Sequence, residues 1–308
     1  MNVDIQSLGT FNQLAHEGAK QATQSLAQMT GIDAVVWLLS NGWSSDAITW
    51  VIPRDGWFWV REGLQPGMAF FDSTMANMIR QNEAYAAATS IDDLGLQMET
   101  AGCWARLSPD VTPGLYHAAT VSHGELETLR HVRDVVRLGR VQRIDASRMQ
   151  FAGGEAVVRP NTLFVDCTAS IFELNEPDDA PVFSDDRIAL KMIRLYQPCF
   201  GAALSAYMEA TIGDTGRIQA MTQATPMTDT VADFTRSMST SMENESAWAN
   251  EPDIAAWMAG CRLNHAHYTI ANFDPADQVR VATMGRVQAT AKPAYENLKR
   301  LAATAQQD

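Results

Sequence analysis

Histidine and cysteine are the side chains best suited to bind a metal or attack a substrate, and this chain has few of either. His265 and His267 have one residue between them, a spacing that would place both imidazoles on one side of a strand. No carboxylate or thiolate completes a metal-binding spacing with them, so we predict no metal site. The cysteines are too scattered for a zinc site or a disulfide framework and are predicted to be reduced thiols: Cys103, Cys167, Cys199 and Cys261.

Tryptophans and one cysteine offer other chemistry. Cys167 follows a predicted strand, where reactive thiols occur, but without a basic neighbour we interpret it as a small buried residue. The sequence has no Gly-x-Ser-x-Gly motif, so no hydrolase nucleophile is indicated. Four tryptophans near Arg54 could stack on an adenine or flavin ring, although core packing is the commoner role: Trp43, Trp50, Trp57 and Trp59.

The composition is that of an acidic globular protein. The 308 residues are 46% hydrophobic and 19% charged, enough for one large domain or two smaller ones. The net charge of -13 disfavours a nucleic-acid partner, which would require a basic surface. No apolar run is long enough to span a bilayer, and the first residues lack the basic and apolar regions of a signal peptide. We therefore expect a cytoplasmic protein without a membrane partner.

The first 130 residues predict helices around one buried strand. Residues 9–30 have the periodicity of an amphipathic helix, and the apolar run over 34–39 is either a strand or a second helix. Residues 48–52, Ile-Thr-Trp-Val-Ile, predict a strand of the kind buried in parallel sheets, ending at Pro53. Further helices are predicted over 70–88, 91–101 and 122–130, the second of them capped by Ser90.

The pattern changes beyond residue 135. Short strand-like pieces occupy 135–138, 141–144, 149–151, 157–158 and 163–165, with turns at Asp145 and Gly153-Gly154. They predict a compact β-meander followed by a buried strand. After a loop over 173–187, helices are predicted over 199–210, 228–242, 253–261 and 275–303. The predicted fold class is therefore α/β, with an inserted β-meander and a helical C-terminal region.

Three segments carry a resemblance to a known class of enzyme. Asp33–Gly42 looks like the helix after a phosphate loop, and Ile48–Asp55 looks like the following strand and its end. Arg140–Ser170, which includes Thr162-Leu-Phe-Val-Asp-Cys-Thr-Ala169, looks like a β-meander and a returning strand. Together they resemble the pyridine-nucleotide half of flavin-dependent oxidoreductases of the monooxygenase and disulfide-reductase type. The resemblance implies an incomplete Rossmann-like parallel sheet.

The same resemblance implies NADP and FAD as cofactors and three cofactor-binding residues, but no catalytic one. Arg54 stands where the second strand ends and would suit the 2′-phosphate of NADP, while a solvated arginine beside Asp55 carries equal weight. Asp166 and Thr168 would lie where the returning strand meets the cofactor. The expected Gly-x-Gly-x-x-Ala is replaced by Leu26-Ala-Gln-Met-Thr-Gly-Ile32, so the glycine phosphate loop is absent.

Residues 1–31 resemble a different family. Leu8–Gly31 looks like the first helix of CheC-type chemotaxis phosphatases, which use an acidic residue and an asparagine three positions apart. The matching positions are Gln13 and His16, so the resemblance implies a phosphatase-like helix without the catalytic pair. An abrupt change near residue 32 favours a junction between two kinds of sequence.

The sequence predicts three domains, over 1–31, 32–172 and 173–308. Three hypotheses about the function of the chain follow. The first is a truncated or degenerate NAD(P)H/FAD-dependent oxidoreductase-like protein that binds a dinucleotide. Its further partner would be a second copy, as a homo-oligomer, or a missing FAD-binding half. The second is a CheC-like signalling protein that docks a response regulator. The third is a folded product without activity, which would expose apolar surface and self-associate.

Overall fold

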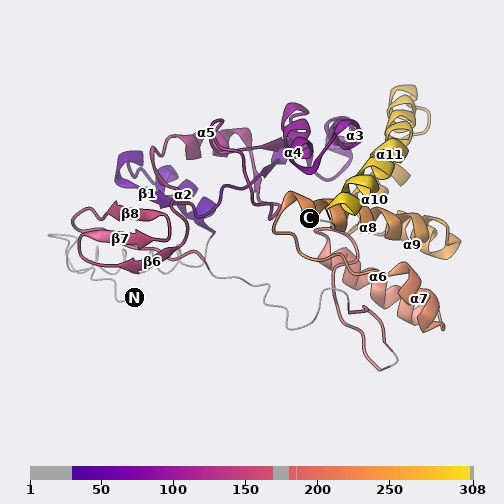
Figure 1. The fold of residues 1–308 in the computed structure, drawn as a ribbon. Helices are drawn as coiled ribbons and strands as arrows, with labels where there is room; N and C mark the ends of the chain where they lie inside the picture. Colours follow the sequence, from indigo (N-terminus) through magenta and orange to yellow (C-terminus); the bar gives the residue numbers. More distant parts are fainter. Residues whose placement is uncertain (1–29, 169–179, 185, 306–308) are drawn as a thin grey trace. The chain divides into compact units, whose positions relative to one another are not determined.

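The computed structural model describes residues 30–168, 180–184 and 186–305, apart from the side chains of 265–267. The chain is a mixed α/β protein with small parallel and mixed sheets and a helical C-terminal region (Figure 1). It divides into two compact units, and each is described by itself. Unit 1 holds residues 30–55, 107–111 and 123–168, and unit 2 holds 56–106, 112–122 and the described residues from 180 onward. The predicted helix over 9–30 and the phosphatase-like segment lie outside the described residues, except for residues 30 and 31.

Unit 1 is built on one pair of parallel strands. β1 (Thr49–Val51) pairs with β5 (Asp134–Val136), and Trp50 lies opposite Val135. The apolar run over 34–39 belongs to a helix, α2 (Gly31–Ser40), which packs against α5 (His123–Arg130). Thr30 begins α2, because its Oγ1 accepts a hydrogen bond from the Asp33 N–H at 3.3 Å. The predicted parallel strand over 48–52 is thus confirmed, although it is half-buried.

A three-stranded antiparallel meander completes unit 1. Its strands β6 (Val141–Ile144), β7 (Arg148–Phe151) and β8 (Gly154–Val157) lie side by side in that order (Figure 1). The predicted β-meander is confirmed over 141–157, and its last strand begins three residues earlier than expected. Its first predicted piece, 135–138, is not part of it, because β5 pairs in parallel with β1. The buried strand predicted over 163–165 is wrong, because this segment pairs with no strand among the described residues. Three apolar residues carry too little signal to specify a pairing partner.

Unit 2 begins with a small mixed sheet and two helices. β2 (Phe58–Val60) lies in the centre, antiparallel to β3 (Trp104–Ala105) and parallel to β4 (Thr120–Val121). Two helices, α3 (Phe71–Ala87) and α4 (Ile91–Thr100), lie within one residue of their predicted bounds. The predicted cap of α4 is confirmed, since Ser90 Oγ accepts from the Asp93 N–H at 3.1 Å. Single-turn 3-10 helices connect these elements: η3 (Arg61–Gly63) and η4 (Met68–Phe70), with η2 (Ser45–Ala47) in unit 1.

The C-terminal part of unit 2 is helical, as predicted. The four predicted helices are α6 (Pro198–Thr211), α8 (Val231–Ala249), α9 (Pro252–Gly260) and α11 (Gln278–Thr304). Two seven-residue helices, α7 (Thr215–Met221) and α10 (His265–Ala271), were not expected. α11 packs against both α3 and α8, which ties the two ends of unit 2 together. No helix among the described residues is long and apolar enough to cross a membrane.

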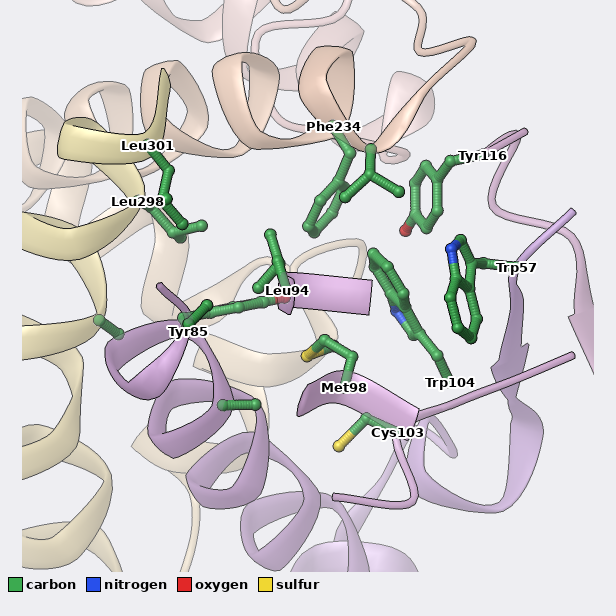
Figure 2. Close-up of a cluster of buried hydrophobic side chains, with 14 of the residues drawn as sticks. Trp57, Tyr85, Leu94, Met98, Cys103, Trp104, Tyr116, Phe234, Leu298 and Leu301 are labelled. Atoms are coloured by element: carbon green, nitrogen blue, oxygen red, sulfur yellow. The ribbon is translucent and has the colours of Figure 1, made fainter. Parts of the chain in front are cut away.

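An aromatic cluster forms the main core of unit 2 (Figure 2). Phe234 from α8 is fully buried, and its ring centroid lies 4.6 Å from that of Tyr116 and 5.2 Å from that of Trp104. Trp57 contacts the same Trp104 ring at 5.9 Å. The cluster therefore joins the small sheet to the helices by tilted and edge-on rings. Other members come from α3, α4 and α11, among them Tyr85, Leu94, Met98, Leu298 and Leu301.

A glycine in α4 is required by this core. A Cβ atom added at Gly95 would lie 2.8 Å from two carbons of the Trp57 indole, and Trp57 is 2% exposed and cannot move aside. We expect Gly95→Ala to destabilise the protein by about 1–3 kcal/mol, even though alanine favours helices. Gly285→Ala in α11 is the matched control, because a Cβ there meets nothing within 4 Å, and it should stabilise by about 0.5–1 kcal/mol. Urea denaturation measures both; a stabilising Gly95→Ala would contradict the packing.

Candidate functional site

The carboxyl ends of β1 and β5 form the first candidate site. Arg54 is exposed, three residues beyond the end of β1, and the next residue, Asp55, has a side chain that is only 5% exposed. Arg137 follows β5 directly and donates two hydrogen bonds to Asp55, from Nε to Oδ2 at 2.8 Å and from Nη2 to Oδ1 at 3.0 Å. The paired carboxylate raises the pKa of Arg137 through these hydrogen bonds. This two-hydrogen-bond ion pair, called the Asp55–Arg137 fork below, fixes the backbone beside Arg54 to the neighbouring strand.

A second polar group lies at the opposite, amino ends of the same strands. Thr49 of β1 donates from Oγ1 to Asp134 Oδ2 of β5 at 2.6 Å. Arg159 reaches both of them, with Nη2 2.6 Å from Thr49 Oγ1 and 3.0 Å from Asp134 Oδ2, and it also donates to the Asp46 carbonyl. The chain leaving the meander is therefore anchored where the parallel strands begin. This contact was not predictable from local sequence patterns, because 110 positions separate Arg159 from Thr49.

Two of the predicted cofactor-binding residues contact each other. Asp166 Oδ1 accepts hydrogen bonds from Thr168, from the backbone N–H at 2.9 Å and from Oγ1 at 2.6 Å. These bonds lower the pKa of the Asp166 carboxyl, and both side chains are exposed. The structure therefore brings Asp166 and Thr168 together in a local turn, whereas Arg54 belongs to a different segment, after β1. Cys167 lies between them, half-buried, in a segment without the predicted strand.

The start of α2 stands where the resemblance would place a pyrophosphate. Thr30 donates from Oγ1 to the Asp33 carboxylate at 2.7 Å, and it also accepts from the Asp33 N–H. An acidic side chain in the first helical turn already stabilises the positive end of the helix dipole. It would repel a phosphate in the same place. The N-terminus of α2 therefore does not fit a pyrophosphate.

Two of the four tryptophans near Arg54 in the sequence are core residues of unit 2, and the other two lie in unit 1. Trp57 and Trp59 are 2% and 7% exposed and belong to the unit 2 core, so the alternative of core packing is confirmed for both. Trp50 lies on β1, and its Nε1 would be 3.5 Å from a Cβ atom added at Gly31. Trp43 is 52% exposed, beyond the end of α2. The four rings were predicted to cluster because they are close in sequence, but unit 2 begins at residue 56, between Trp50 and Trp57.

The histidines and cysteines form no metal site among the described residues. His265 and His267 lie on the helix α10, so the interpretation that they share one side of a strand is wrong. The four cysteines form no disulfide bond in the described part of the chain. Cys103 is fully buried, and its thiol donates to Asn77 Oδ1 at 3.3 Å.

The thiols should differ strongly in reactivity. Burial raises the pKa of Cys103 to about 11, and Cys199 is exposed. In the folded protein at pH 8, we expect iodoacetamide to modify Cys199 first and Cys103 at least about a hundredfold more slowly than in urea. Mass spectrometry of the labelled peptides measures both rates. Equal labelling of Cys103 and Cys199 in the folded protein would show that Cys103 is accessible.

Comparison with known proteins gives relatives without a known activity. The described fold defines a mixed α/β protein with small parallel and mixed sheets. The chain is 37% identical over 261 residues to the uncharacterized proteins Rv2000 and MT2056 of Mycobacterium tuberculosis and Mb2023 of Mycobacterium bovis. The match covers 85% of this chain and 47% of each relative, so the chain spans about half the length of the curated relatives it matches. No protein-family model matches the chain. No solved structure matches it significantly.

Proposed function

We propose that unit 1 is an incomplete Rossmann-like, NADP-binding part of a flavoprotein-oxidoreductase-like protein, and that Arg54 binds the 2′-phosphate of the nucleotide. The observation that carries the proposal is the parallel β1–β5 pair, with an exposed arginine beyond β1 and the Asp55–Arg137 fork beside it. In open α/β sheets, ligands bind outside the carboxyl ends of parallel strands. A guanidinium is well suited to a phosphate, because it can donate two hydrogen bonds to it.

The segment over 159–168 carries the other two residues proposed to bind the nucleotide. Arg159 is anchored to Thr49 and Asp134, at the amino ends of β1 and β5. The chain then runs through the half-buried Leu-Phe-Val of residues 163–165 to Asp166 and beyond. Because this run pairs with no strand among the described residues, the proposal that Asp166 and Thr168 bind the nucleotide rests on the resemblance alone.

The cofactors fit this unit unequally. An exposed arginine beside a fixed fork suits the ribose-phosphate end of NADP, while the capped start of α2 does not suit the pyrophosphate. FAD is implied by the resemblance alone, since no two glycines in the sequence have the Gly-x-Gly spacing of an FAD-binding turn. We therefore propose a degenerate member of this class, which binds a nucleotide weakly and transfers no hydride by itself.

Isothermal titration calorimetry with NADPH and NADH tests the proposal. We expect the protein to bind NADPH more tightly than NADH, because only NADPH carries the 2′-phosphate. Arg54→Gln should weaken NADPH binding about tenfold to a hundredfold, the range for one charge-assisted contact. It should leave NADH binding almost unchanged.

Arg143→Gln is the matched control for charge. Arg143 lies on β6 in the same unit and is exposed, so this variant removes one positive charge from unit 1 without removing Arg54. We expect its NADPH affinity to equal that of the original protein. Equal affinities for NADPH and NADH, or an equal loss in Arg54→Gln and Arg143→Gln, would contradict the proposal.

The signalling alternative depends on residues 1–31, of which only 30 and 31 are described. In it, the first helix docks a response regulator without phosphatase activity, since Gln13 and His16 replace the catalytic pair. Pull-down with a phosphorylated receiver domain separates the two proposals, because NADPH binding by unit 1 does not require this helix.

A further inference from the structure

The carboxyl ends of β1 and β5 carry more positive than negative charge. Arg54 follows β1, and both Arg137 and Arg140 follow β5. The four residues after each strand include a single carboxylate, that of Asp55, which is already paired with Arg137. Two positive charges therefore remain at one edge of the sheet, in a chain whose net charge is -13.

The turn that carries Arg140 is fixed at this edge of the sheet. Arg137, at the start of the turn, is bound to Asp55 by two hydrogen bonds. The Leu138 carbonyl accepts a hydrogen bond from the Gly153 N–H at 3.1 Å, which attaches the same turn to the β-meander. Arg140 lies three residues after Arg137, a span of at most about 11 Å. The chain therefore holds Arg140 close to the Asp55–Arg137 fork.

No described residue neutralises Arg140. The residue is exposed, and its side chain forms no hydrogen bond or ion pair with the described part of the chain. Positive charges that share a small region repel one another, and a bound anion would remove this repulsion. A phosphate monoester carries about two negative charges at neutral pH, whereas a phosphodiester carries about one. Two guanidinium groups, those of Arg54 and Arg140, therefore match a phosphate monoester.

We propose that Arg140 is a second phosphate-binding residue of the Arg54 site, and that this site takes a ribonucleotide with a phosphate monoester on its ribose. The inference rests on the proposed function, because it concerns the same site. The ligand does not need a pyrophosphate, since the Asp33 carboxylate at the start of α2 would repel one. The contacts that bind the ligand are therefore those of its monoester with Arg54 and Arg140.

Isothermal titration calorimetry with adenosine 2′-monophosphate tests the role of Arg140. We expect Arg140→Gln to weaken binding about tenfold, because one charge-assisted hydrogen bond is lost. Arg133→Gln is the matched control and should bind the nucleotide as tightly as the original protein does. Arg133 directly precedes β5, at its opposite end, and its exposed side chain likewise forms no hydrogen bond or ion pair with a described residue. Both positions are exposed, so both variants should fold.

A second titration, with NADP⁺, tests the ligand class. NADP⁺ should bind no more than about threefold more tightly than adenosine 2′-monophosphate, because the pyrophosphate adds little, and a larger difference would overturn the ligand class. Equal affinities of Arg140→Gln and Arg133→Gln for adenosine 2′-monophosphate would overturn the role of Arg140. The proposed function would still stand in that case if Arg54→Gln weakens NADPH binding. A protein that binds none of these nucleotides would contradict both proposals.

Discussion

Phe234→Ala should lower the free energy of unfolding by about 3–5 kcal/mol, the largest effect of any single substitution proposed for this chain. Phe234 is 0% exposed, and its ring contacts four other aromatic rings at centroid distances from 4.6 to 6.5 Å. Truncation removes those contacts and leaves a cavity between helix α8 and the small sheet. Rigid neighbouring rings such as Trp104 cannot collapse into it, so the cost should lie at the upper end of the range.

Phe70→Ala provides the control for the loss of an aromatic ring. Phe70 belongs to the same unit but is 45% exposed, so its removal leaves no enclosed cavity. We expect a loss of less than about 1 kcal/mol, measured by urea denaturation with circular dichroism. Similar losses in Phe234→Ala and Phe70→Ala would contradict the aromatic cluster as the main core of unit 2.

The second large effect is expected at the carboxyl ends of the parallel strands. Asp55→Ala should destabilise unit 1 by about 2–3 kcal/mol, because it removes the carboxylate that accepts two hydrogen bonds from the Arg137 guanidinium. The value lies below that of a fully buried ion pair, since the Arg137 side chain is 31% exposed. Hydrogen exchange detected by mass spectrometry should show faster exchange in peptides that contain β1 and β5.

Glu155→Ala is the matched control for this ion pair. Glu155 pairs with Arg148 on the meander of the same unit, but the two side chains are 46% and 60% exposed. A solvated pair contributes little, so the change in stability should be less than about 0.5 kcal/mol. If Asp55→Ala has as small an effect, the Asp55–Arg137 fork does not hold the strand ends together.

Local sequence patterns predicted which helices and strands form better than they predicted which strands pair. The run Ile-Thr-Trp-Val-Ile indicated β1, and Ser90 with Asp92 and Asp93 indicated the start of α4. These signals depend on neighbouring residues alone. That residues 163–165 pair with no strand among the described residues was not predictable in the same way, because a three-residue apolar run does not specify a partner. The seven-residue helices α7 and α10 are shorter than the window over which helical periodicity is visible.

The candidate site was predictable only in part, for the same physical reason. Arg54 could be placed at a strand end because it follows Pro53 directly. The buried pairing of its neighbour Asp55 with Arg137, 82 positions away, was not predicted, because it depends on the parallel register of β1 and β5. The Trp57 and Trp59 rings lie in the core of unit 2, although only a few residues separate them from Arg54 in sequence. Proximity along the chain was therefore a poor guide where one unit ends and the next begins.

The most direct test of nucleotide binding at Arg54 is ³¹P NMR of NADP⁺ titrated with the protein. The 2′-phosphate and the pyrophosphate give separate resonances, so each end of the ligand reports its own contact. We predict that the 2′-phosphate resonance shifts or broadens, that the pyrophosphate resonance changes less, and that Arg54→Gln returns the 2′-phosphate to its free position. A 2′-phosphate resonance that stays at its free position with excess protein would contradict the assignment.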